Sequence, residues 1–131
     1  MKKKIIWIID DDPIYQTIIH KLILKSGVFS AHSSFLNGNE AINALNNIVE
    51  DNDKLPDIIL LDINMPVMDG WEFMEQIKML KSKISKQIII YIVSSSIAIE
   101  DRNKSKTYKD IFGYIAKPIS VNDLITMISK E

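Results

Sequence analysis

Five apolar segments alternate with five helical patterns along this chain, and that alternation limits the fold more than any other feature. Each apolar segment has the length of a strand and is bounded by polar or turn-forming residues. The expected strands are residues 4–9, 28–35, 58–61, 87–93 and 112–116. Helices are expected after each of them, the fourth within the polar segment 97–110. Such alternation predicts an α/β fold, a parallel sheet with helices on both faces.

Composition narrows the class of protein. The 131 residues, 47% of them hydrophobic, suit one domain with a full core. Sixteen Lys and Arg against seventeen Asp and Glu give a charge of −1, which argues against direct nucleic-acid binding. Cysteine is absent, so disulfides and thiolate chemistry are excluded. No apolar stretch has membrane-spanning length. We expect a cytoplasmic single domain over 1–131 without an output domain, since the last helical pattern reaches the C-terminus.

Three consecutive aspartates follow the apolar run 5–9 directly. An apolar run bounded by polar residues indicates a strand buried on both faces, so these carboxylates lie at the carboxyl edge of the sheet. Like charges held this close repel unless a cation joins them. Asp12 is expected to cap a helix, because Pro13 after it suits the first helical position. Asp10 and Asp11 remain as a helix-capping pair or as part of a cation site.

Chemically useful residues also follow the other expected strands: Asp62, Ser94 and Lys117. Parallel strands bring their carboxyl ends to one edge, so these side chains should meet Asp10 and Asp11 there. Three carboxylates suit a hard divalent cation, for which Mg²⁺ is the best candidate, whereas no His or Cys lies in this pattern to favour zinc. A carboxylate beside such a cation can attack phosphorus, and a lysine can neutralise the transferring group.

Four sequence blocks at the strand ends resemble the receiver domain of two-component response regulators. They are 8–13 (IIDDDP), 56–70 (PDIILLDINMPVMDG), 93–95 (VSS) and 113–118 (GYIAKP). The resemblance covers essentially the whole chain. It implies a doubly wound, flavodoxin-like sheet of five strands in the order 2-1-3-4-5.

The resemblance also implies a role for each site residue. Asp62 would be the phosphoacceptor. Mg²⁺ would be held by Asp10, Asp11 and Asp62, with the backbone carbonyl of Asn64 as a further ligand. Lys117 would contact the phosphoryl group. The donor would be a sensor histidine kinase or a histidine phosphotransfer protein.

The same resemblance implies a switch. The Ser94 hydroxyl would move toward the phosphoryl group, Tyr114 would turn inward behind it, and the peptide bond between Lys117 and Pro118 would be cis. The protein would then act by contact with a downstream protein, as a monomer or weak dimer, with no membrane partner. It would catalyse its own phosphorylation and dephosphorylation but would be a signalling switch, not a metabolic enzyme. Ser96 and Asn64 would tune the lifetime of the phosphoryl group.

Three other functions compete with this one. A pseudo-receiver would keep the fold as a protein-binding module without phosphate turnover. The presence of Asp10, Asp11, Asp62 and Lys117 argues against it. An aspartyl-phosphate phosphatase would usually carry Asp-x-Asp after its first strand; the spacing after Asp62 gives Asn64. A flavodoxin-like FMN carrier would need a phosphate-binding loop where this chain has three aspartates. His20 and His32 are expected to be surface or rim residues.

Overall fold

A computed structural model describes residues 3–95 and 98–129 and contains one five-stranded sheet. The strand order is β2-β1-β3-β4-β5, and every pairing is parallel. The strands are β1 (Lys4–Ile9), β2 (Phe29–Phe35), β3 (Ile58–Leu61), β4 (Ile89–Ser94) and β5 (Ile111–Ala116). The predicted α/β class and strand order are therefore confirmed.

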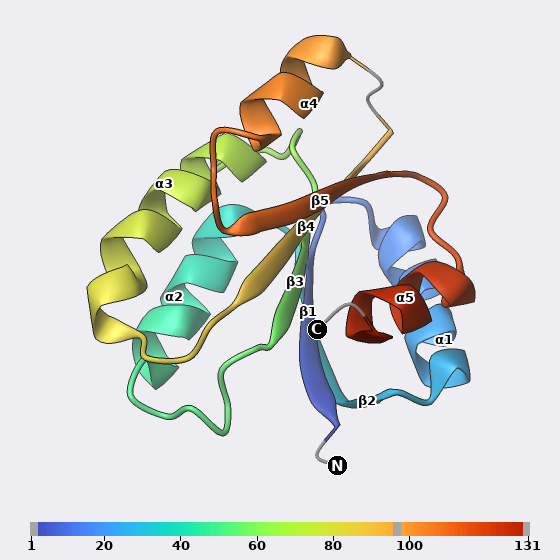
Figure 1. Cartoon of the computed structure of the whole chain (residues 1–131), viewed down its shortest axis with the longest axis horizontal. Coiled ribbons are helices and arrows are strands. Elements are labelled where there is room, and N and C mark those ends of the chain that lie inside the picture. The colour runs from blue at the N-terminus through green and yellow to red at the C-terminus, as the bar shows by residue number, and fades with distance from the viewer. Residues whose placement is uncertain (1–2, 96–97, 130–131) are drawn as a thin grey trace.

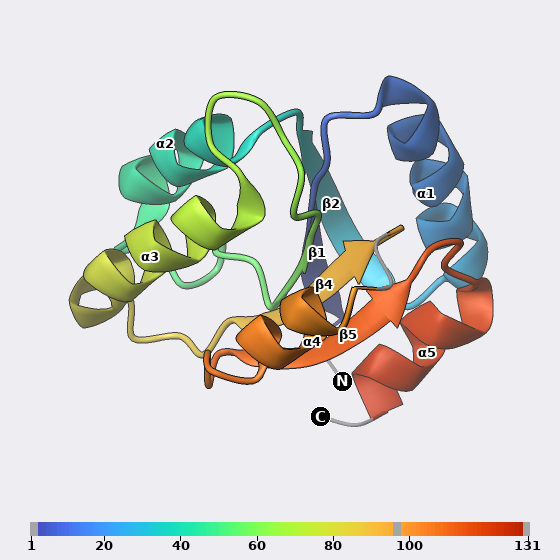
Figure 2. The ribbon, with the colours of Figure 1, turned by 90° about the horizontal axis from the view of Figure 1, so that it is seen from above.

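Helices cover both faces of the sheet (Figure 1). They are α1 (Pro13–Ser26), α2 (Gly38–Ile48), α3 (Gly70–Leu80), α4 (Ile99–Ser105) and α5 (Val121–Ser129), with a short 3-10 turn, η1 (Lys81–Lys83), after α3. Figure 2 shows α1 and α5 on one side of the sheet and α2 and α3 on the other, with α4 near β5. Within 3–95 and 98–129, no helix has the length and apolar character needed to cross a membrane.

The core lies on both faces of the central strands. Trp7 and Ile9 of β1 pack into the cluster under α2 and α3, whereas Ile6 and Ile8 pack into the cluster under α1 and α5. All four side chains are buried. Since successive side chains of a strand point to opposite faces, a strand covered on both sides must be apolar at every position. This explains why β3 and residues 5–9 of β1 are continuous apolar runs.

The predicted boundaries of β4 were wrong, whereas α4 lies within the segment predicted for it. β4 begins at Ile89 and includes Ser94, which was predicted to follow the strand. Ser94 pairs with Ala116 of β5, and its carbonyl accepts a hydrogen bond from the Lys117 N–H at 3.0 Å, so strand pairing continues through it. The fourth helix is confined to Ile99–Ser105 and has no side-chain hydrogen bond at its N-cap.

Candidate functional site

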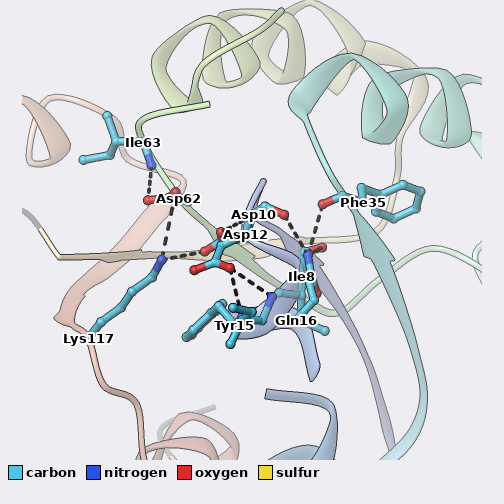
Figure 3. Close-up of polar contacts among 10 residues, drawn as sticks. Ile8, Asp10, Asp12, Tyr15, Gln16, Phe35, Asp62, Ile63 and Lys117 are labelled. Carbon is cyan, nitrogen blue, oxygen red and sulfur yellow. Dashed lines mark hydrogen bonds and ion pairs between the residues drawn. The ribbon is translucent and has the colours of Figure 1, made fainter. Parts of the chain in front are cut away.

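The carboxyl ends of four parallel strands place the predicted site residues at one edge of the sheet. Asp10 follows β1, Asp62 follows β3, Ser94 ends β4 and Lys117 follows β5. Figure 3 shows the side chains of Asp10, Asp62 and Lys117 pointing toward one another, although these residues are far apart in the sequence. The parallel topology is thus what creates the cluster.

Three of the carboxylates form a compact acidic group. One carboxylate oxygen from each of Asp10, Asp11 and Asp62 lies within 4.8 Å of the others. Asp10 and Asp62 are 2% and 8% exposed, whereas Asp11 is exposed to solvent. Oxygen ligands, one of them exposed to solvent, suit a hard divalent cation that keeps several of its waters. These residues therefore fit Mg²⁺.

The Asp12 side chain is not part of this group and caps α1 instead. Its Oδ1 accepts hydrogen bonds from the backbone N–H groups of Ile14 at 2.9 Å and Tyr15 at 3.3 Å. Pro13 occupies the first helical position. The expected capping role of Asp12 is confirmed, which leaves Asp10 and Asp11 as the acidic pair after β1.

Lys117 provides the positive charge of the site. Its Nζ lies 2.7 Å from Oδ2 of Asp10 and 4.0 Å from Oδ2 of Asp62. The Lys117–Pro118 peptide bond is cis, as the resemblance implied. The ammonium therefore lies against two of the three carboxylates and offsets part of their charge.

Asp62 is the carboxylate whose ionisation the fold opposes. Burial, and then the negative charge of Asp10, raises the pKa of Asp62 to about 6, although Lys117 and the Ile63 N–H act in the opposite direction. That N–H donates to Oδ1 of Asp62 at 2.9 Å. The surroundings of the Asp62 carboxylate therefore favour the binding of an additional positive charge.

The loop after Asp62 depends on Gly70. A Cβ at Gly70 would lie 2.5 Å from the carbonyl oxygen of Asp62 and 2.9 Å from Cα of Ile63. The Gly70 N–H donates to the carbonyl of Ile63 at 2.8 Å, and Val67 lies in the left-handed region with φ 69°. The loop therefore folds back so that α3 begins against the backbone of Asp62. Asn64 is exposed on this loop, and its role as a carbonyl ligand stays a prediction.

Sequence reasoning missed Gln16, which supports the first acidic residue. This buried side chain donates from Nε2 to the carbonyls of Asp10 at 3.0 Å, Phe35 at 3.1 Å and Ile8 at 3.4 Å. It joins the ends of β1 and β2 directly behind Asp10. A polar residue within the apolar stripe of α1, one turn before Ile19, was the signal that could have identified it.

The two predicted switch residues lie on neighbouring strands. Ser94 is buried, and Tyr114 of β5 is half-buried, with the Arg102 guanidinium 4.7 Å from its ring centroid. Their proposed movement stays a prediction, and Ser96 lies outside the described residues. His20 is exposed on α1 and His32 is half-buried on β2, with their rings in edge-to-face contact at 4.4 Å, as expected for rim residues.

The sequence comparison matches residues 6–129 to the response regulator receiver domain. The chain belongs to this family. The receiver domain is 28% identical over 130 residues to the DNA-binding transcriptional regulator NtrC of Salmonella typhimurium, covering 99% of this chain and 25% of NtrC. It is 32% identical over 127 residues to the sensor histidine kinase CheAY of Helicobacter pylori, covering 97% of this chain and 15% of CheAY. The chain therefore spans a quarter or less of these relatives.

Solved structures agree with this assignment. A two-component response regulator from Cytophaga hutchinsonii superposes with a TM-score of 0.83 at 30% identity, over 98% of this chain and 97% of that one. The receiver domain of the sensor histidine kinase PA1611 from Pseudomonas aeruginosa has the same fold, with a TM-score of 0.78 at 20% identity over 98% and 97% of the chains. That structure has a magnesium ion coordinated in its active-site cleft.

Proposed function

We propose that this receiver domain accepts a phosphoryl group on Asp62 from a histidine kinase or a histidine phosphotransfer protein, in a Mg²⁺-dependent reaction in the cytoplasm. It then signals by contact with another protein. The proposal is supported above all by the oxygens of Asp10, Asp11 and Asp62, which lie within 4.8 Å of one another beside Lys117. A pseudo-receiver would not need this set.

In this proposal Asp10, Asp11 and Asp62 hold Mg²⁺, with the carbonyl of Asn64 as a further ligand. The ion, when bound, supplies positive charge that neutralises the phosphoryl oxygens. The all-oxygen donor set and the buried, electrostatically opposed carboxylate of Asp62 favour such an ion. The magnesium ion reported for the PA1611 receiver domain agrees with this proposal.

The chain's own residues perform the transfer. A carboxylate oxygen of Asp62 attacks phosphorus, and its new bond to phosphorus forms as the phosphorus–nitrogen bond of phosphohistidine breaks. Lys117, already 4.0 Å from Asp62, neutralises negative charge on the transferring group. Attack of water on the same phosphorus later breaks its bond to Asp62 and releases inorganic phosphate, so Asp62 returns to the free carboxylate and the domain also limits its own signal.

The switch uses the ends of β4 and β5. The buried hydroxyl of Ser94 donates to a phosphoryl oxygen, and Tyr114 turns inward behind it. The new charge thereby selects one of two arrangements of this region. In this proposal the face formed by α4, β5 and α5 presents the change to a downstream protein.

Intact-mass measurement after incubation with acetyl phosphate tests the proposal. The wild type should gain the mass of one phosphoryl group only when Mg²⁺ is present, and base should remove it. Asp62→Asn should gain nothing. Asp12→Asn is the matched control, since asparagine also caps helices well and the Asp12 side chain caps α1; it should behave as the wild type. No gain in the wild type would favour the pseudo-receiver.

A further inference from the structure

Tyr15 contacts the site from α1, and the proposed chemistry does not use it. Nζ of Lys117 lies 4.2 Å from the centroid of its ring. The side chain is half-buried, and its hydroxyl oxygen is shielded from solvent without a hydrogen-bond partner within the described ranges. Hydrogen bonding by the hydroxyl therefore does not explain why this ring lies here. The ring makes two other contacts, one with the apolar cluster under α1 and α5 and one with Lys117.

The position of the ring relative to the charges is informative. Lys117 lies over Tyr15 on one side and against Asp10 and Asp62 on another (Figure 3). Burial, and then the negative charges of Asp10 and Asp62, raises the pKa of the Tyr15 hydroxyl, so the phenol stays neutral beside the two carboxylates. A neutral ring can hold a cation by its face without adding another charge to the acidic group.

We propose that Tyr15 is a positioning residue, whose ring holds the Lys117 ammonium beside Asp62. A lysine ammonium sits on a flexible four-carbon stem, so a fixed position needs more than one contact. If Asp10 binds a divalent cation, the ion pair between Lys117 and the Asp10 carboxylate becomes weaker. The Tyr15 ring is then the contact that keeps the ammonium near Asp62. The kinetic consequence of this inference rests on the proposed function. The contact between Tyr15 and Lys117 does not depend on that function.

NMR of the metal-free protein tests the contact without any phosphoryl transfer. The ring current of Tyr15 should shift the ε-methylene protons of Lys117 upfield. Tyr15→Phe should keep that shift, because the aromatic face is retained, and Tyr15→Leu should abolish it. Unchanged Lys117 resonances in Tyr15→Leu would overturn the proposal, whether or not the protein accepts phosphate.

Phosphorylation rates test the consequence. With acetyl phosphate and Mg²⁺, Tyr15→Leu should be slower than the wild type by about threefold to tenfold, the range of a cation–π contact. Tyr15→Phe should stay within about twofold of the wild type, since the ring alone acts on the cation. Equal rates for all three proteins would overturn the proposal. Absence of phosphorylation in the wild type would refute the proposed function instead, and the NMR comparison would still decide the contact.

Discussion

Asp62 couples the stability of this domain to pH. Its folded pKa, about 6, is above its ordinary value of 3.8 because burial and Asp10 oppose its charge. The folded state therefore holds a proton that the unfolded chain releases between these values. The resulting stabilisation is fully present below about pH 3.8 and is lost as the pH rises through about 6.

Asp62→Asn should therefore stabilise the metal-free domain at neutral pH. Asparagine does not ionise, so we expect the free energy of unfolding at pH 7.5 to rise by about 1–3 kcal/mol, with little change at pH 4. Urea denaturation of both proteins at the two pH values, with a chelator present, measures this. Asp12→Asn, which keeps a helix-capping side chain, is the comparison for an Asp-to-Asn change at an exposed position. An equal effect of Asp62→Asn at both pH values would contradict the electrostatic explanation.

Gly70 should tolerate no side chain, since a Cβ there would lie 2.5 Å from the carbonyl oxygen of Asp62. We expect Gly70→Ala to destabilise the domain by about 1–3 kcal/mol, the usual effect of overpacking. It should also slow phosphorylation, because the backbone that carries Asp62 must shift. Denaturation and acetyl phosphate kinetics measure the two effects.

Gly27 supplies the control for Gly70→Ala. It lies in the left-handed region with φ 67°, and a Cβ there would have no atom within 4 Å. Gly27→Ala should cost about 1 kcal/mol from backbone strain alone and leave phosphorylation unchanged. Similar kinetic effects of both substitutions would mean that the close approach at Gly70 does not matter for the site.

At the scale of elements, α4 is attached to α3 through aromatic contacts. Trp71 of α3 stacks on Tyr108, which follows α4, with ring centroids 5.9 Å apart at 14°. The Tyr108 hydroxyl donates to Oε2 of Glu75 at 2.6 Å, and Nζ of Lys104 lies 5.1 Å from the Trp71 ring. A helix of seven residues without a side-chain cap needs such tertiary support.

Removal of the stack should loosen α4. We expect Trp71→Leu to raise amide hydrogen exchange over residues 99–105 by about fivefold, since an aromatic pair contributes about 1 kcal/mol. Met79→Leu provides the comparison, because Met79 is on α3 but 72% exposed. It should leave exchange in α4 as it is. Equal exchange in Trp71→Leu and the wild type would show that α4 is held by other contacts.

The sequence predicted the elements well where one pattern dominated. β3 and, from Ile5 onward, β1 are apolar at every position because both faces are covered, and the bounds of both strands were predicted correctly. The end of β4 was predicted incorrectly, because Ser94 continues the strand only by pairing with Ala116, a contact distant in sequence. The supporting roles of Gln16 and Tyr15 were missed for a similar reason. Both depend on the packing of α1 against strand ends, which the pattern of α1 alone does not reveal.

At the scale of the whole molecule, the parallel sheet gathers residues as distant as Asp10 and Lys117. Topology and strand ends predicted this gathering, because every parallel strand delivers its next residue to the same edge. The downstream partner and the oligomeric state stay predictions, since they depend on surfaces that meet other molecules. The same is true of the movement of Ser94 and Tyr114.

A Mg²⁺ titration followed by amide NMR tests most directly whether this edge forms one cation site. We predict saturable shifts concentrated at the backbone of Asp10, Asp11, Asp62 and Asn64, and their loss in Asp10→Asn. Binding should also stabilise the fold, by about 1.4 kcal/mol at ten times the dissociation constant. Shifts that spread evenly over surface acids, or a spectrum of residues 9–12 and 62–64 that does not change at millimolar Mg²⁺, would contradict the account.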